Sequence, residues 1–143
     1  MLFRSLGAKV ARPDKLVFNI AGDGCFRMNM NEIATAARYN IPVIQVVINN
    51  HVLGMVRQWQ TLFYGQRYSN TTLNDQVDFV KLAEAMGAKG IRVTKKEEIA
   101  AAFKEAKKNT KAPTVIEFII DPEEMVYPMI KPGGTLEDMI MDC

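Results

Sequence analysis

The stretches KLVFNIA at residues 15–21 and VIQVVI at residues 43–48 decide the fold class. Each is a short, nearly continuous apolar run with β-branched members, which is the pattern of a strand buried on both faces of a sheet. Between them, residues 29–39 carry apolar side chains at helical spacing, and Pro42 marks the end of that helix. A buried strand, a helix and a second buried strand predict the repeating unit of a parallel sheet.

The rest of the chain continues this alternation. Apolar spacing predicts helices at residues 53–64, 78–86 and 96–108, and strands at residues 91–93 and 114–120. The predicted order is β-α-β-α-α-β-α-β. This order is typical of an α/β fold, a three-layer α/β/α Rossmann-like sandwich with a mostly parallel sheet.

Composition excludes several classes of protein. A length of 143 residues with 48% hydrophobic residues suits one domain, and a scattered net charge of +2 argues against nucleic acid as a partner. No apolar run approaches the ~20 residues of a membrane span, and residues 1–13 lack the features of a signal peptide. Two cysteines, Cys25 and Cys143, are too few for a disulfide framework. We therefore expect a cytoplasmic protein that does not bind membranes.

The composition changes after the last predicted strand. Residues 121–143 contain three prolines and a Gly-Gly pair without regular periodicity. We expect an α/β domain over residues 1–120 and a C-terminal tail over residues 121–143. The tail is predicted to wrap the surface or to close over a site.

Unusual polar residues follow the first two predicted strands. Gly22-Asp23-Gly24 follows the first strand, and Asn49-Asn50 follows the second. In open parallel sheets, ligands bind beyond the carboxyl ends of the strands, so these residues should face one crevice. Glycines on both sides of Asp23 would allow positive φ angles and the close approach of a diphosphate. Mg²⁺ prefers oxygen ligands, which the Asp23 carboxylate, an Asn carboxamide and the diphosphate would supply.

A structural interpretation competes with this one. Asp-Gly is a strong hairpin signal, and Asn-Asn is common in loops. The hairpin interpretation weakens because the segment after Gly24 has the period of a helix. Asn49-Asn50 at the next strand end then favours a ligand site.

The spacing and the neighbouring motifs resemble a known family. Asn50 lies 27 positions after Asp23, which resembles the thiamine-diphosphate fingerprint of Gly-Asp-Gly followed by Asn-Asn. Several segments resemble the acetolactate synthase large subunit: GDGCFRMNMN (22–31), EIATAARYN (32–40), NNHVLGMVRQWQTLFYGQRY (49–68), DFVKLAEAMG (78–87) and the tail motifs at 128–129 and 132–134. The most specific segment is GMVRQWQ at residues 54–60.

The resemblance implies roles for individual residues. Mg²⁺ would be held by the side chains of Asp23 and Asn50 and by the carbonyl of Val52, with His51 as a bystander. Trp59 would shape the channel through which the second 2-ketoacid enters. The residues implied to bind the cofactor are Gly22, Asp23, Gly24, Cys25, Asn50, Gly54 and Met55.

The same resemblance implies a thiamine-diphosphate-dependent transferase. It would condense two pyruvates, or pyruvate with 2-ketobutyrate, in branched-chain amino acid biosynthesis. The activating glutamate would come from the pyrimidine-binding domain of a partner large subunit, FAD would bind a domain outside this segment, and a small regulatory subunit is possible. We expect this segment to hold no catalytic residue and, alone, to be inactive and to bind the cofactor weakly.

Other functions remain open at this stage. Pyruvate oxidase, glyoxylate carboligase and 2-ketoacid decarboxylases would share the metal site, and a non-catalytic truncated module could keep the same residues. A Mg²⁺ phosphohydrolase with Asp23 as nucleophile is disfavoured, because no lysine or second acid accompanies the turn. From spacing alone, Trp59, Phe63, Tyr64 and Tyr68 favour a core or a subunit interface.

Overall fold

The computed structural model describes residues 2–73 and 77–142. Their contacts divide the chain into two compact units. The first unit comprises Met1–Asn49 and Asp75–Ile120, and the second comprises Asn50–Asn74 and Asp121–Cys143. The sequence predicted a division at residue 120 only, and it did not anticipate that residues 50–74 group with the tail.

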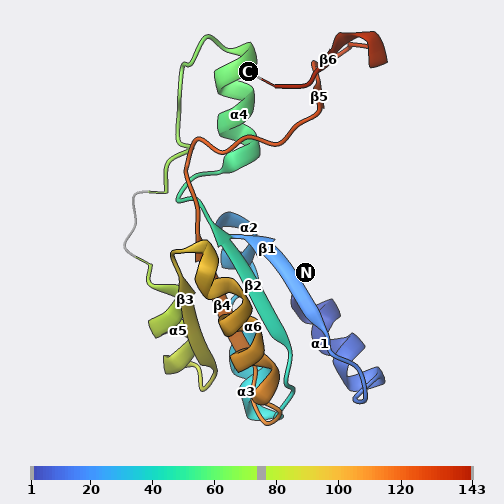
Figure 1. Cartoon of the computed structure of the whole chain (residues 1–143), viewed down its shortest axis with the longest axis vertical. Helices are drawn as coiled ribbons and strands as arrows, with labels where there is room; N and C mark the ends of the chain where they lie inside the picture. Colours follow the sequence, from blue (N-terminus) through green and yellow to red (C-terminus); the bar gives the residue numbers. More distant parts are fainter. Residues whose placement is uncertain (1, 74–76, 143) are drawn as a thin grey trace. The chain divides into compact units, whose positions relative to one another are not determined.

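A parallel sheet forms the centre of the first unit (Figure 1). Its strands lie in the order β1 (Phe18–Gly22), β2 (Ile44–Asn49), β4 (Thr114–Ile119) and β3 (Lys89–Val93). Each neighbouring pair is parallel. At the carboxyl edge, Ile48 lies between Gly22 on one side and Phe118 on the other. The predicted parallel sheet is therefore confirmed.

Four helices cover one face of this sheet. Phe26, Ile33 and Phe79 pack there against Val47 and Val115 of the central strands. The rings of Phe26 and Phe79 meet edge to face, with centroids 5.4 Å apart. The helices are α1 (Leu2–Ala11), α2 (Asp23–Arg27), α3 (Glu32–Arg38) and α5 (Phe79–Ala85).

The opposite face carries a second core. Helix α6 (Ile99–Lys108), preceded by the 3-10 helix η1 (Lys96–Glu98), places Ala102 and Ala106 against Val46 and Ile116. Because apolar side chains alternate between the two faces of β2 and β4, both faces are buried. Helices on both sides of a parallel sheet confirm the predicted three-layer α/β/α fold.

Helix α5 has well-defined ends. The Asp78 side chain accepts hydrogen bonds from the backbone N–H groups of Val80 and Lys81, both at 3.1 Å. The bond from Lys81 is the main reason that the pKa of Asp78 lies below its ordinary value. At the other end, Gly87 has a φ of +82°, a conformation that glycine adopts without strain.

The second unit is built around helix α4 (Gly54–Phe63). The buried side chain of Gln58 binds the tail: its Nε2 donates to the carbonyl of Val126 at 2.9 Å and to the Sδ of Met129 at 3.1 Å, and the Val126 N–H donates to its Oε1 at 2.9 Å. An Arg57–Glu123 ion pair adds another link. Farther along, β5 (Met129–Ile130) pairs antiparallel with β6 (Met139–Ile140), and the 3-10 helix η2 (Leu136–Asp138) precedes β6.

Two local expectations need correction. The sequence predicted a turn at residues 22–24, but β1 continues through Gly22 and α2 begins at Asp23. Gly22 has a φ of −68°, so the positive φ expected there is not used. Parallel pairing with Ile48 extends the strand by this residue.

Helix α1 and strands β5 and β6 were not predicted. Within the described residues, no helix is long and apolar enough to cross a bilayer.

Candidate functional site

The carboxyl ends of β1 and β2 lie side by side in the first unit. Gly22 pairs with Ile48, so Asp23 and Asn49 come next on neighbouring strands. Both side chains are buried, with exposed fractions of 2% and 1%. The sequence-based expectation that these two strand ends are neighbours is confirmed, and Asn50 follows Asn49 through one peptide bond.

Asp23 stands at the first position of α2. Its Oδ1 accepts the backbone N–H of Gly24 at 2.9 Å, and the positive end of the helix dipole stabilises a carboxylate at this position. The Gly24 amide, expected to face a diphosphate, thus already donates to Asp23. Gly22 and the exposed Cys25 line a cavity of about 240 Å³ beside the end of β1. Space for a ligand group therefore exists next to the predicted turn.

A tight turn in the second unit contains two more of the predicted metal ligands, Asn50 and Val52. The Asn50 Oδ1 accepts the backbone N–H of Val52 at 3.2 Å, and His51 between them has a φ of +59°. Val52 is buried and forms an antiparallel bridge with Thr72. The structure therefore brings Asn50 and Val52 together in one turn that is held by backbone pairing.

Gly54 is required for the position of Asn50. A Cβ atom on Gly54 would lie 2.9 Å from the Nδ2 of Asn50, which is closer than real Cβ contacts come. A side chain at residue 54 would force the carboxamide of Asn50 to move. The predicted cofactor residue Gly54 therefore has a local role that the structure explains.

Replacing Gly54 with alanine should move the Asn50 carboxamide while changing the free energy of unfolding little. The displaced atom is the end of a flexible side chain, and alanine gains up to about 1 kcal/mol of helix propensity over glycine. We expect the NMR signals of the Asn50 side-chain NH₂ group to shift. Unchanged signals in Gly54→Ala would contradict this assignment.

Gly7→Ala is the matched control. Gly7 lies within α1, and a Cβ there would meet nothing within 4 Å. This substitution should stabilise the protein by roughly 0.5–1 kcal/mol, because alanine loses less backbone entropy on folding. The Asn50 signals should stay in place.

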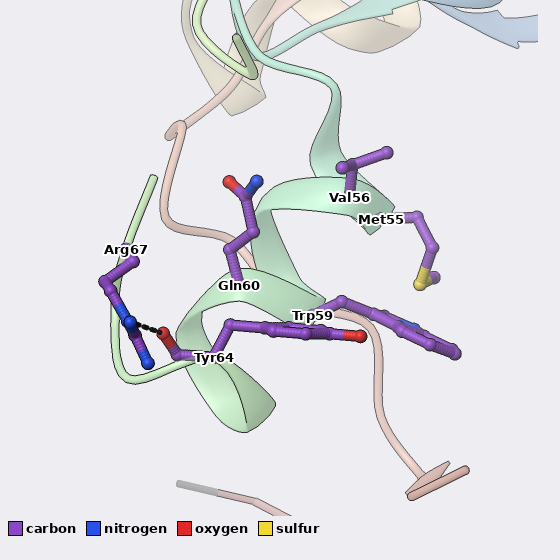
Figure 2. A pocket seen from close by; sticks show the side chains of 6 residues that line it. All are labelled: Met55, Val56, Trp59, Gln60, Tyr64 and Arg67. Carbon is purple, nitrogen blue, oxygen red and sulfur yellow. Dashed lines mark hydrogen bonds between the residues drawn. The ribbon is translucent and has the colours of Figure 1, made fainter. Parts of the chain in front are cut away.

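Helix α4 borders a cavity in the second unit. It has a volume of about 660 Å³, within the usual range for small-molecule sites. Figure 2 shows Met55, Val56, Trp59 and Tyr64 along it, with Arg67 donating to the Tyr64 carbonyl at 3.4 Å. Trp59 and Tyr64 are exposed, so the core alternative is wrong for them, whereas the subunit-interface alternative stays a prediction.

A buried polar network crosses three strands of the first unit. The Asn49 Nδ2 donates to the Glu117 Oε1 at 2.7 Å, and the Arg92 Nε donates to the Glu117 Oε2 at 2.7 Å. Arg92 also donates to Asp78 at 2.6 Å. The hydrogen bond to Glu117 is the main cause that raises the pKa of Arg92. The sequence signal was a glutamate inside the apolar run TVIEFII, at residues 114–120.

The comparison with protein families identifies the chain. A family model for the thiamine pyrophosphate enzyme C-terminal TPP-binding domain matches residues 4–118. The chain belongs to this family. Thiamine pyrophosphate, or TPP, is another name for thiamine diphosphate, so the predicted cofactor class agrees with the family of this TPP-binding domain.

Curated relatives support the narrower resemblance. The TPP-binding domain is 48% identical over 139 residues to the acetolactate synthase large subunit of Corynebacterium glutamicum. It is 46% identical over 136 residues to the probable large subunit of Methanocaldococcus jannaschii. It is 43% identical over 136 residues to the isozyme 2 large subunit of Escherichia coli. These matches cover 94–95% of the chain but only 22–25% of the relatives.

A solved structure shares the fold of this TPP-binding domain. It is the thiamine diphosphate-dependent 4-hydroxybenzoylformate decarboxylase of Rhodococcus jostii RHA1, with a TM-score of 0.75 and 32% sequence identity. The match covers 84% of this chain and 23% of the decarboxylase. It confirms the Rossmann-like fold expected from the sequence.

Proposed function

We propose that this TPP-binding domain holds the diphosphate and metal end of the cofactor in an acetolactate synthase large subunit. The observation that carries the proposal is the register of β1 and β2, which brings Asp23 and Asn49 to neighbouring strand ends. Asn50 follows directly. Relatives that cover almost the whole chain are named acetolactate synthase large subunits, which favours this enzyme over others of the superfamily.

The side chains present suit a magnesium diphosphate. In the proposal, the Asp23 carboxylate, the Asn50 carboxamide oxygen and the Val52 carbonyl hold Mg²⁺, which takes few protein oxygens beside phosphate. A neutral carboxamide adds no charge next to the diphosphate. Gly54 supports this fit, because only the absence of a side chain leaves Asn50 its place.

Other residues of the chain would bind the cofactor and orient the second ketoacid. Gly22, Gly24 and Cys25 would border the diphosphate, and Met55 would contact another part of the cofactor. When bound, thiamine diphosphate supplies an electron sink for decarboxylation of a 2-ketoacid. Trp59, in the cavity along α4, would guide the second ketoacid and exclude water.

The remaining components lie outside this segment in the proposal. The chain spans about a quarter of the length of the curated relatives, so the whole enzyme's substrates and partners are inferred. We infer pyruvate and 2-ketobutyrate as substrates, a partner large subunit that supplies the pyrimidine-binding domain, an FAD-binding domain and a possible regulatory subunit. The assembly would be an oligomer in the cytoplasm.

A chimeric enzyme tests the proposal. In it, this chain replaces the matching 139-residue region of the Corynebacterium glutamicum large subunit. The chimera should convert pyruvate to acetolactate when thiamine diphosphate and Mg²⁺ are supplied, because the Corynebacterium glutamicum enzyme supplies the other regions of the large subunit. The isolated 143-residue chain should form none.

The products separate the alternatives. Acetaldehyde would indicate a decarboxylase, and acetyl phosphate would indicate a pyruvate oxidase. A folded chimera that binds thiamine diphosphate but forms no product would favour a non-catalytic module. Acetolactate production by the isolated chain would contradict the proposed division of the active site.

A further inference from the structure

Glu117 is a buried carboxylate in the middle of the sheet. It lies on β4, between β2 and β3, and only 1% of its surface is exposed. Such a group is costly unless each oxygen has a partner. Oε1 accepts from Asn49 on one side, and Oε2 accepts from Arg92 on the other. The metal and cofactor roles proposed above assign Glu117 no part.

The charge of Glu117 determines how Asn49 is oriented. A carboxylate accepts hydrogen bonds but donates none, whereas a carboxamide has one donor side and one acceptor side. Asn49 must therefore turn its amide nitrogen toward Glu117 and its oxygen away. The backbone carbonyl of Asn49 also accepts the N–H of Ile120 at 3.0 Å. The last residue of β2 is thus held by both its side chain and its backbone.

Arg92 fixes Glu117 in turn. Its guanidinium bridges Glu117 and Asp78, and Asp78 caps the first turn of α5. The planar guanidinium makes both contacts in one rigid geometry. The path from the α5 cap to the end of β2 therefore consists of charge-assisted hydrogen bonds, which are stronger and more directional than neutral ones.

We propose that Glu117, held by Arg92, is a positioning residue for the turn at Asn50–Val52. Glu117 fixes Asn49, the residue directly before this turn, and so restrains the backbone from which the turn begins. That the turn binds a metal rests on the function proposed above. Residues that orient ligands in this way typically change metal affinity by 10–100-fold when they are replaced.

The test compares two Glu→Gln substitutions in the chimeric enzyme and in the isolated chain. Glu117→Gln keeps the shape but lets a neutral amide face Asn49 in either orientation. Glu105→Gln is the control, because Glu105 pairs with Lys89 and Lys108 near the surface rather than with Asn49. Both substitutions remove one negative charge.

Two measurements keep the outcomes separate. In the chain without ligand, Glu117→Gln should shift the NMR signals of the Asn49 side chain and of the Asn50 and Val52 amides, whereas Glu105→Gln should not. In the chimera, Mn²⁺ binding with thiamine diphosphate, followed by water proton relaxation, should weaken about tenfold in Glu117→Gln only. An unchanged thermal midpoint in both variants would exclude a general loss of structure.

Each failure has its own meaning. Unchanged signals at Asn50 and Val52, or unchanged Mn²⁺ affinity, would overturn the positioning role. Absence of Mn²⁺ and cofactor binding in the unsubstituted chimera would instead overturn the proposed function. If Glu117→Gln does not fold, Arg92→Lys tests the same link, because lysine keeps the charge but cannot form both contacts in the same geometry. Arg92→Lys should shift the NMR signals of the Asn49 side chain and of the Asn50 and Val52 amides.

Discussion

Metal-dependent binding of thiamine diphosphate should fall about a hundredfold when Asp23 is replaced with asparagine, which corresponds to about 2.8 kcal/mol. The substitution keeps the size of the side chain but removes the only negatively charged protein ligand of the proposed metal site. The free energy of unfolding should fall by less, roughly 0.3–1 kcal/mol, because a carboxylate in the first turn of a helix contributes that much to stability.

The measurement is a titration of the chimeric enzyme with thiamine diphosphate at fixed Mg²⁺. Asp14→Asn is the matched control, since Asp14 is an exposed aspartate that pairs with Arg12 in the same unit. Cofactor affinity in the control should equal that of the unsubstituted enzyme. If Asp23→Asn binds the cofactor as tightly as the control, the metal role of Asp23 is wrong.

Replacing Arg92 with methionine should lower the free energy of unfolding by about 3 kcal/mol, which is about a 10 °C lower melting temperature. The substitution leaves the buried carboxylate of Glu117 without its cation, and removal of one partner of a buried pair typically costs 3–5 kcal/mol. We expect the lower end of this range, because 41% of the Arg92 side chain is exposed. Urea unfolding at neutral pH measures the difference.

The pH dependence gives a second check on Arg92. The pKa of Asp78 is lowered mainly by the Lys81 amide and further by Arg92. A lowered pKa means that Asp78 stabilises the fold above its unfolded value of about 3.9, and that this contribution is lost as the pH falls through the folded pKa. The stability gap between the native protein and Arg92→Met should therefore narrow at acid pH.

Two further variants complete the test of Arg92. Arg12→Met removes an arginine from an exposed ion pair with Asp14 and should change the free energy of unfolding far less than Arg92→Met does. Arg92→Met combined with Glu117→Gln should recover part of the lost stability, because the buried charge is then absent. A double variant as unstable as Arg92→Met alone would show that the ion pair is not the cause.

Continuous apolar runs allowed the strands and their ends to be predicted, but burial on both faces is confirmed only for β2 and β4: β1 lies at the edge of the sheet, where Phe18 and Ile20 are exposed. Continuous apolar runs at residues 15–21 and 43–48 indicated strands, and the polar residues directly after them indicated the ligand-binding edge. The order β1-β2-β4-β3 could not be predicted, because no residue pattern states which strands pair. The hydrogen-bond partners of Glu117 could not be predicted for the same reason, although the sequence shows a charged residue within an apolar run.

Other differences have local causes. The glycines around Asp23 suggested a turn, but strand pairing and the helix that follows override that local preference. Helix α1 had a weak signal in Leu2 and Leu6, which are one turn apart and face the core. The strands β5 and β6 contain two residues each, which is too short for any period to be detected.

The order of the strands also determines when the site can form during synthesis. β4 separates β2 from β3 in the sheet, yet Thr114 pairs with Ile44, which precedes it by 70 positions. At a translation rate of ~5–20 residues per second, the ribosome needs roughly 4–14 s to add this stretch. Until then β2 has an unpaired edge, and the glutamate that orients Asn49 has not been made. A nascent chain that stops before β4 therefore exposes the unpaired edge of an apolar strand, which is a template for aggregation.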